Sequence, residues 1–119
     1  AWSLDDHGIP VFAAAAGFTA SHQFAVEAAR YGGGQAAAKK LRKANLLACG
    51  IGLPIDAVAG DMNGLRIGTP ALVRWGVMEE DARLLAGLIA RALKSDEPAR
   101  LAAETTELRS HYSGLYFIR

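Results

Sequence analysis

The sequence has little of several features that mark large classes of protein. It contains one cysteine, which excludes an intramolecular disulfide and a multi-cysteine metal site. No apolar run reaches the roughly 18 residues that a membrane-spanning helix needs. The formal net charge is +1, so there is no bulk electrostatic argument for a nucleic-acid partner. We therefore expect a cytoplasmic protein with neither a membrane nor a nucleic acid among its partners.

What the chain does contain is enough for one folded domain. Its 119 residues are 51% hydrophobic and 21% charged, which excludes a disordered tail or a collagen-like fibre. Alanine makes up about a fifth of the residues and favours helix where the pattern is ambiguous. Short apolar runs alternate with amphipathic segments, and this order predicts a single α+β domain in two layers over residues 1–119.

The expected elements follow from apolar periodicity and from the positions of glycine and proline. Residues 1–8 resemble the last turns of a truncated helix that ends at Gly8, which indicates a fragment of a longer protein. We expect strands at 11–16, 24–29 and 49–54, an extended segment at 65–77, and helices at 35–48, 78–94 and 98–112. Residues 55–64 should form a loop ending in a tight turn at Asn63 and Gly64, and residues 114–119 a short tail.

Several patterns that can carry chemistry have an ordinary structural interpretation here. The triple glycine at 32–34 lacks the spacing of a phosphate loop, so we expect a flexible turn, with an anion cradle as the alternative. The basic cluster at 39–43 fits the solvated face of a helix better than a phosphate contact. The three histidines are too scattered to predict a zinc site. A calcium-like start at Asp61 lacks glutamate at its twelfth position, which is Leu72. Cys49 is expected to be a buried, inert thiol.

A single arginine in an apolar, glycine-rich stretch is the strongest candidate for a binding residue. Arg66 lies between Leu65 and Ile67, with Gly64 and Gly68 beyond them. We expect a strand arginine in these surroundings to be partly desolvated and to need an anionic partner. A carboxylate matches the planar guanidinium with two hydrogen bonds, and the glycines permit close approach of a ligand. This chemistry leaves two partners open, an internal Asp or Glu and the carboxylate of a ligand.

The same stretch carries a family resemblance. Residues 64–71 read Gly-Leu-Arg-Ile-Gly-Thr-Pro-Ala, and Arg74 and Gly76 continue the match. This segment resembles the Gly-(Ile/Leu)-Arg-(Ile/Leu/Val)-Gly-(Thr/Ala)-Pro-Ala segment of serine (glycine) hydroxymethyltransferases, and the order of elements is similar from residue 8 to residue 112. The resemblance implies the C-terminal small domain of a fold-type-I pyridoxal-phosphate enzyme. Such a domain has a small antiparallel or mixed sheet of about three to four strands, with helices packed on one face.

The resemblance also implies a role for the arginine. In that family this residue binds the substrate α-carboxylate, so Arg66 is expected to bind an amino-acid substrate, with Gly64, Thr69 and Arg74 as possible further contacts. A fixed carboxylate sets which bond at the substrate Cα is cleaved. The reaction implied is one-carbon transfer between serine (or 2-methylserine) and glycine (or alanine), in a homodimeric full-length enzyme.

One departure from the family concerns the cofactor. In the family, the lysine that binds pyridoxal phosphate and the phosphate-binding residues belong to a large domain. None of the four lysines in this sequence fits the family's lysine motif; they are Lys39, Lys40, Lys43 and Lys94. We therefore expect no catalytic, cofactor-binding or metal-binding residue in these 119 residues, and a fragment that is inactive without its large domain.

The second departure concerns folate. The family usually has Asn-Lys-Asn before the proline that corresponds to Pro54, whereas residues 49–53 read Cys-Gly-Ile-Gly-Leu. The use of tetrahydrofolate therefore stays open. The alternative is a folate-independent aldolase or transaldolase of β-hydroxy amino acids, and a stand-alone, non-catalytic module of the same fold is a further one. A third hypothesis, nucleic-acid binding through residues 39–43, predicts salt-sensitive retention on a polyanion.

Overall fold

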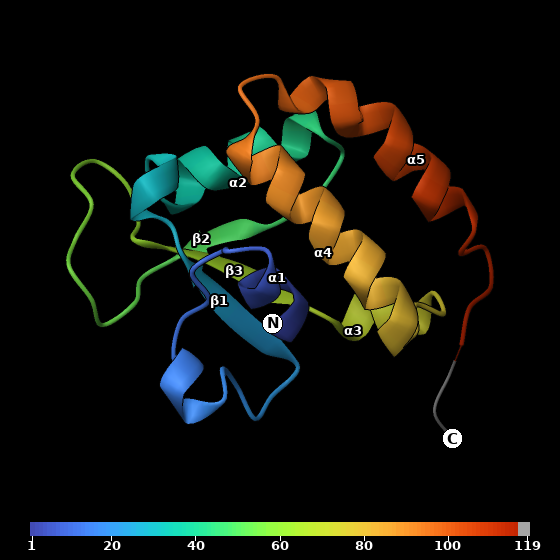
Figure 1. The fold of residues 1–119 in the computed structure, drawn as a ribbon, viewed down its shortest axis with the longest axis horizontal. Coiled ribbons are helices and arrows are strands. Elements are labelled where there is room, and N and C mark those ends of the chain that lie inside the picture. The colour runs from blue at the N-terminus through green and yellow to red at the C-terminus, as the bar shows by residue number, and fades with distance from the viewer. Residues whose placement is uncertain (117–119) are drawn as a thin grey trace.

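The computed structural model describes residues 1–116. Its main elements are α1 (Trp2–Asp6), β1 (Gln23–Glu27), α2 (Gly34–Lys43), β2 (Cys49–Ile51), β3 (Gly64–Gly68), α3 (Pro70–Arg74), α4 (Glu79–Lys94) and α5 (Ala102–Ser110) (Figure 1). Short 3-10 turns lie at Ala14–Ala16, Ala29–Tyr31 and Pro98–Leu101. The last three residues of the predicted tail at 114–119 lie outside the described residues.

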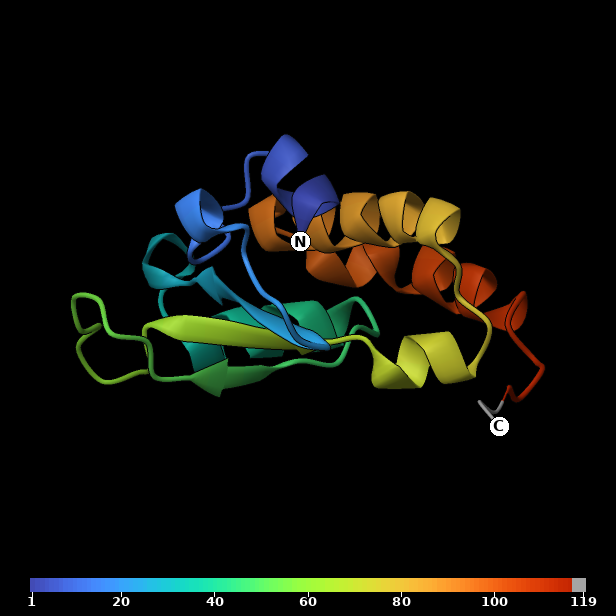
Figure 2. The ribbon, with the colours of Figure 1, turned by 90° about the horizontal axis from the view of Figure 1, so that it is seen from below.

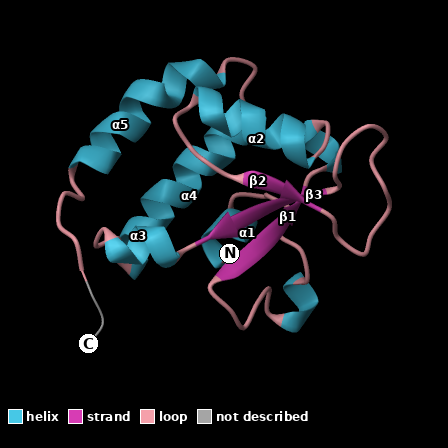
Figure 3. Ribbon diagram, turned by 180° about the vertical axis from the view of Figure 1, so that it is seen from behind, coloured by secondary structure: helices cyan, strands magenta, loops and turns pink. Residues whose placement is uncertain are grey.

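The three strands form one antiparallel sheet in the order β1-β3-β2, so the strand that carries Arg66 is central (Figure 3). Helix α2 contacts β2 and β3. In Figure 2, α2 lies behind the strands and α4 and α5 run along one side. No helix within residues 1–116 covers the side of the sheet turned to the viewer in that figure, which we call the open face. The predicted α+β fold, with helices packed on one face of a small sheet, is confirmed.

Alternation along the strands decides which side chains enter the core, because successive strand residues point to opposite faces. Val26 of β1 and Leu65 of β3 are both 0% exposed and lie between the sheet and the helices. Helix α2 buries Ala37 and Leu41, and Ala44 just after its end is buried as well. Helix α4 adds a buried row of its own: Ala86, Leu88, Ile89, Ala90, Ala92 and Leu93.

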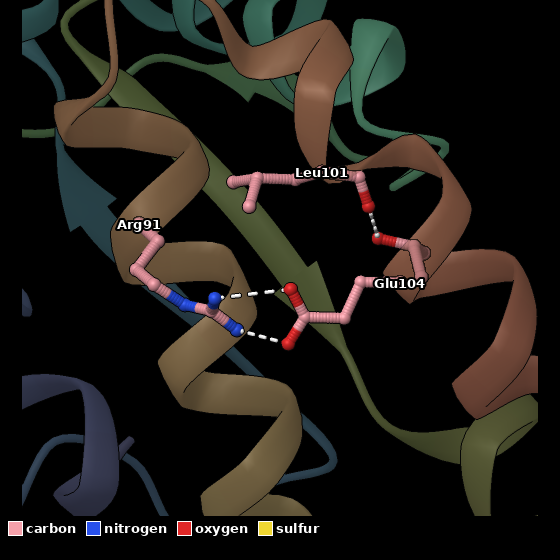
Figure 4. Close-up of polar contacts among 4 residues, drawn as sticks. Arg91, Leu101 and Glu104 are labelled. Atoms are coloured by element: carbon pink, nitrogen blue, oxygen red, sulfur yellow. Dashed lines mark hydrogen bonds and ion pairs between the residues drawn. The ribbon is translucent and has the colours of Figure 1, made fainter.

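The helix predicted at 78–94 is confirmed, and it is tied to the following helix. Met78 is the N-cap residue of α4, and its backbone N–H donates a hydrogen bond to Asp81 Oδ2 at 2.9 Å. Arg91 of α4 donates from Nη1 and Nη2 to the two carboxylate oxygens of Glu104 in α5, at 3.0 and 2.6 Å (Figure 4). Thr105 Oγ1 donates to the Leu101 carbonyl oxygen at 3.1 Å. The last helix ends at Ser110, so the predicted extension to residue 112 is too long.

The strand predicted at 11–16 is wrong beyond its first residue. Val11 forms an isolated bridge with Val26, but the chain then turns through Ala13 at φ +59° and Gly17 at φ +84°. The alanines between them form a 3-10 turn and are exposed. A run of alanines has little side-chain area to bury on a sheet and a strong helical preference, so it does not extend the strand.

Two further boundaries differ for reasons of local chemistry. The extended segment predicted at 65–77 ends at Gly68, because Pro70 begins α3 and its fixed φ suits the first turn of a helix. The helix predicted at 35–48 ends at Lys43, and Asn45 adopts φ +62°, a left-handed conformation that asparagine tolerates. The strands predicted at 24–29 and 49–54 are present in shorter or shifted form, as β1 and β2.

The tight turn predicted at Asn63 and Gly64 is also wrong. Gly64 is the first residue of β3, and Asn63 is buried on the inner side of the loop between β2 and β3. The Asn63 side chain accepts a hydrogen bond from the Leu53 backbone N–H at 2.6 Å and donates one to the Leu53 carbonyl at 2.8 Å. The Asn63 side chain thus holds the two ends of the loop together through hydrogen bonds to the backbone, and no tight turn forms there.

Candidate functional site

Arg66 occupies the middle of the central strand and is exposed on the open face. Its register partners are Ala25 in β1 and Cys49 in β2, whose side chains therefore share its face. Its neighbour Leu65 points the other way and is fully buried. Arg66 thus stands on a three-stranded platform with a short side chain on each side.

The two glycines that flank Arg66 on its own face have different surroundings. A Cβ at Gly64 would lie 2.7 Å from Leu53 Cδ1, so the absence of a side chain makes room for Leu53 to pack there. A Cβ at Gly68 would meet Pro70 Cδ only at 3.7 Å, an ordinary contact. The predicted close approach of a ligand therefore has space on the Gly68 side, while Leu53 borders the other side.

The structure corrects the expectation that Arg66 is desolvated. The guanidinium is exposed in this chain because no helix within the described residues covers the open face. It makes no hydrogen bond or ion pair within residues 1–116, so the internal Asp or Glu partner is wrong for this part of the chain. Of the two partners considered from the sequence, the carboxylate of a ligand is the one that remains.

The other predicted contacts lie beyond the end of β3. Thr69 donates two hydrogen bonds to the His22 carbonyl oxygen, from its backbone N–H at 2.9 Å and from Oγ1 at 3.0 Å. Its hydroxyl therefore fastens the end of β3 to the start of β1. Arg74 lies in the last turn of α3, and its carbonyl oxygen accepts a hydrogen bond from the Tyr116 N–H at 2.8 Å.

The described residues do not form a site for pyridoxal phosphate. Lys40 Nζ donates to the Leu93 carbonyl oxygen at 2.8 Å, and Lys94 Nζ donates to the His7 carbonyl oxygen. Lys39 and Lys43 are exposed on α2, which packs on the covered face. None of the four lysines stands beside Arg66, so these residues contribute no step through the cofactor. Within residues 1–116 there is also no group of three or more His, Cys, Asp or Glu side chains placed to hold a metal ion.

Three other predictions from the sequence have structural outcomes. All three histidines are exposed. Cys49 is half-buried beside Arg66, so the expectation of a buried thiol is wrong. The basic cluster is not a free patch, because Lys40 holds the end of α4.

An anion does bind next to the triple glycine, at the start of α2, and that anion belongs to the chain itself. Asp61 Oδ1 and Oδ2 accept hydrogen bonds from the backbone N–H groups of Gln35 and Ala36 at the start of α2, at 2.9 and 3.0 Å. The sequence pattern left an anion cradle at the glycines as an alternative to a flexible turn and excluded a calcium loop at Asp61, but it did not connect the two segments. No local signal connects them, because Gln35 and Asp61 are 26 residues apart.

Sequence reasoning also missed an apolar groove of about 390 Å³ on the helical side. It lies among the loop after α2, helices α3, α4 and α5, and the end of β3, and its walls include Leu46, Leu72, Trp75, Leu85 and Leu108. Arg109 stacks over the Trp75 ring, with 4.3 Å from Cζ to the ring centroid, and so joins α5 to α3 at its rim. Apolar periodicity in the sequence does not reveal this groove, because its walls come from five separate segments.

Comparison with known proteins shows which enzymes this chain is similar to. No protein-family model matches the chain. An alpha-methylserine aldolase of Variovorax paradoxus is 61% identical over 116 residues, which are 98% of this chain and 26% of the relative. Another, from a Ralstonia species, is 52% identical over 118 residues. A serine hydroxymethyltransferase of Pyrobaculum arsenaticum is 35% identical over 110 residues, which are 92% of this chain and 26% of the relative.

A solved structure agrees with these sequences. The crystal structure of L-threonine transaldolase from Pseudomonas fluorescens in its internal aldimine state superposes with a TM-score of 0.78 at 27% identity, covering 97% of this chain and 26% of that one. The resemblance predicted from residues 64–71 is confirmed: the chain is similar, over nearly its whole length, to the C-terminal part of these enzymes. It spans about a quarter of the length of the curated relatives that it matches. No helix among the described residues is both long and apolar enough to cross a membrane.

Proposed function

We propose that this chain is the C-terminal small domain of a larger pyridoxal-phosphate enzyme, and that Arg66 binds the α-carboxylate of its amino-acid substrate. The observation that carries the proposal is the placement of Arg66. It stands exposed on the open face of the sheet, with no acidic partner within residues 1–116, in a segment that matches the family's arginine strand. The other predicted contacts, at Gly64, Thr69 and Arg74, are less important to the proposal than Arg66. Gly64 leaves room for the Leu53 side chain, and Thr69 fixes the end of the strand.

The reaction favoured is the aldol cleavage and formation of a β-hydroxy amino acid. For 2-methylserine, breaking the Cα–Cβ bond and moving the hydroxyl proton gives alanine and formaldehyde. Two observations favour this reaction over folate-dependent transfer from serine to glycine. Relatives named alpha-methylserine aldolase are 52–61% identical, against 35% for the Pyrobaculum arsenaticum hydroxymethyltransferase. Cys49 and Ile51 also share the open face with Arg66, and they lie in the stretch before Pro54 where the resemblance implies Asn-Lys-Asn in hydroxymethyltransferases.

Within such an enzyme, this domain orients the substrate and does not itself cleave a bond. The guanidinium donates two parallel hydrogen bonds to the carboxylate, which fixes the rotation of the substrate about Cα. Bound pyridoxal phosphate, held by the large domain, would supply the electron sink for the cleavage. The short side chains of Ala25 and Cys49 beside the guanidinium leave it accessible to the substrate. A homodimeric assembly and a cytoplasmic location stay predictions from the sequence.

Substitution of Arg66 in the full-length enzyme tests the role of this residue. Arg66→Ala should lower kcat/KM by about 10²–10³-fold, since a charge-assisted carboxylate contact and the orientation that it fixes are both lost. The cofactor absorbance should be unchanged, because the described residues do not hold the cofactor. Arg83→Ala, an exposed arginine of α4, is the matched control. Near-normal turnover and substrate affinity in Arg66→Ala would disprove the role.

The aldolase reaction is tested by supplying 2-methylserine to the full-length enzyme with and without tetrahydrofolate. We expect release of formaldehyde and alanine at the same rate in both cases. A strict requirement for tetrahydrofolate would favour the hydroxymethyltransferase reaction instead. No turnover of any β-hydroxy amino acid, together with no cofactor absorbance, would leave the non-catalytic module as the better description.

A further inference from the structure

The loop between β2 and β3 is fastened to the start of α2 by one carboxylate. Besides the hydrogen bonds from Gln35 and Ala36, Asp61 Oδ1 accepts one from the Met62 N–H at 2.6 Å. The pKa of Asp61 lies below its ordinary value, chiefly because of the hydrogen bond from the Gln35 N–H. The hydrogen bonds from the Ala36 and Met62 N–H groups and the charge of Lys39 also lower it. The carboxylate is therefore ionised near neutral pH, where it complements the positive end of the helix dipole.

The triple glycine makes room for this contact. Gly33 has φ +117°, and a Cβ there would lie 2.5 Å from Asp61 Cγ. A Cβ at Gly34 would lie 2.0 Å from the Gly64 carbonyl oxygen. A side chain at Gly33 would displace Asp61, and one at Gly34 would displace the first residue of β3. Gly33 and Gly34 therefore allow the segment before Arg66 to pack closely against the start of α2.

Backbone hydrogen bonds extend the contact up to the strand. The Gly34 N–H donates to the Met62 carbonyl at 2.7 Å, and the Ala28 N–H donates to the Asn63 carbonyl at 2.9 Å. Three consecutive residues, 61–63, are therefore held in place directly before β3 begins. This arrangement fixes where the chain starts along the strand direction.

The start of the strand matters because apolar alternation does not fully determine the position of Arg66. A slip of one residue would bury Arg66 and expose Leu65, so the core opposes it. A slip of two residues keeps every side chain on its own face but moves the guanidinium by about 7 Å along the sheet. Only contacts at fixed positions, such as those of Asp61, distinguish the observed register from that slipped one.

We infer that Asp61 is a positioning residue that places Arg66 for the substrate carboxylate. This inference rests on the proposed function of Arg66. Asp61 acts through the register of β3 and does not itself touch the substrate. An amide at this position has one acceptor oxygen, so it cannot serve the Gln35 and Ala36 N–H groups with one oxygen each, and its NH₂ group would face a donor.

The test compares two aspartates of the same loop in the full-length enzyme. Asp61→Asn should raise the KM for the amino-acid substrate about tenfold, with kcat changed less than about twofold and the cofactor absorbance unchanged. Asp56→Asn is the matched control, because the Asp56 side chain forms no hydrogen bond or ion pair within residues 1–116. It should leave both constants unchanged. If Asp61→Asn does not fold, Asp61→Ser is measured instead, because its hydroxyl can still accept one helix N–H.

A double substitution separates positioning from general stability. Arg66→Lys keeps a charge but loses the two-pronged contact, so its KM should rise as well. If Asp61 acts through Arg66, adding Asp61→Asn to Arg66→Lys should raise the KM by much less than it does alone. A fully additive effect, or a normal KM in Asp61→Asn beside a raised KM in Arg66→Lys, would overturn this inference alone. A normal KM in Arg66→Lys and in Arg66→Ala would overturn the proposed function, and this inference with it.

Discussion

β3 presents Leu65 to the helices and Arg66 to the open face, and these adjacent residues have opposite surroundings. Leu65 is 0% exposed and packs within the core. Arg66 is exposed and has no partner within residues 1–116. The covered face therefore carries the stability of the domain, while the open face carries a charge that contributes little to folding.

A second arginine shows that an exposed guanidinium in this chain can be paired internally. Arg91 forms a two-pronged contact with Glu104 and joins α4 to α5 (Figure 4). Arg66 has no such acid opposite it, because its register partners are Ala25 and Cys49. This difference is the structural basis of the proposal that Arg66 binds a carboxylate from outside the domain.

The largest expected effect separates the two faces of β3. Leu65→Ala should lower the free energy of unfolding by about 2–5 kcal/mol, because it removes buried side-chain volume and leaves a cavity. Arg66→Ala should change it by no more than about 0.5 kcal/mol, because the side chain is exposed and unpaired. Denaturant unfolding of the 119-residue chain measures both. Equal losses in the two variants would contradict the division between the faces.

A smaller effect comes from giving Arg66 an internal partner like that of Arg91. Ala25→Asp places a carboxylate directly opposite Arg66, where it would compete with the proposed substrate carboxylate. The KM of the full-length enzyme should rise about tenfold, and less so at high salt because the new pair is exposed. Ala25→Asn has nearly the same shape without the charge and should change the KM little. If both variants raise the KM equally, crowding rather than charge is responsible.

The smallest effect concerns the paired arginine and depends on pH. The hydrogen bond from Arg91 lowers the pKa of Glu104 from its ordinary value of 4.5. The stabilisation from this pair should therefore be present above that value and be lost as the pH falls through the lowered pKa. Glu104→Gln should slightly lower the melting temperature at neutral pH and not in acid, and the KM should not change. A difference that grows in acid would contradict this assignment.

Much of the fold could be predicted because it depends on local patterns. Helix α4 follows from its apolar period and its acidic first turn, and β1 from a short apolar run. The eight residues from 64 to 71 also identified the strand that carries Arg66. The failures share a cause: at Ala14–Ala16 and at Asn63, the conformation is decided by hydrogen bonds and packing that a linear pattern does not contain.

The candidate site shows the same division. The sequence by itself determined that one arginine stands among apolar residues and glycines in a strand, and that none of its lysines fits the family's motif. Only the tertiary structure decided that this arginine faces the open side of the sheet without an acidic partner in residues 1–116, and that Asp61 binds the start of α2 beside Gly33. The reason is distance along the chain. Ala25, Cys49 and Arg66 become neighbours only when three strands pair, and Asp61 meets Gln35 only when the loop folds back onto α2.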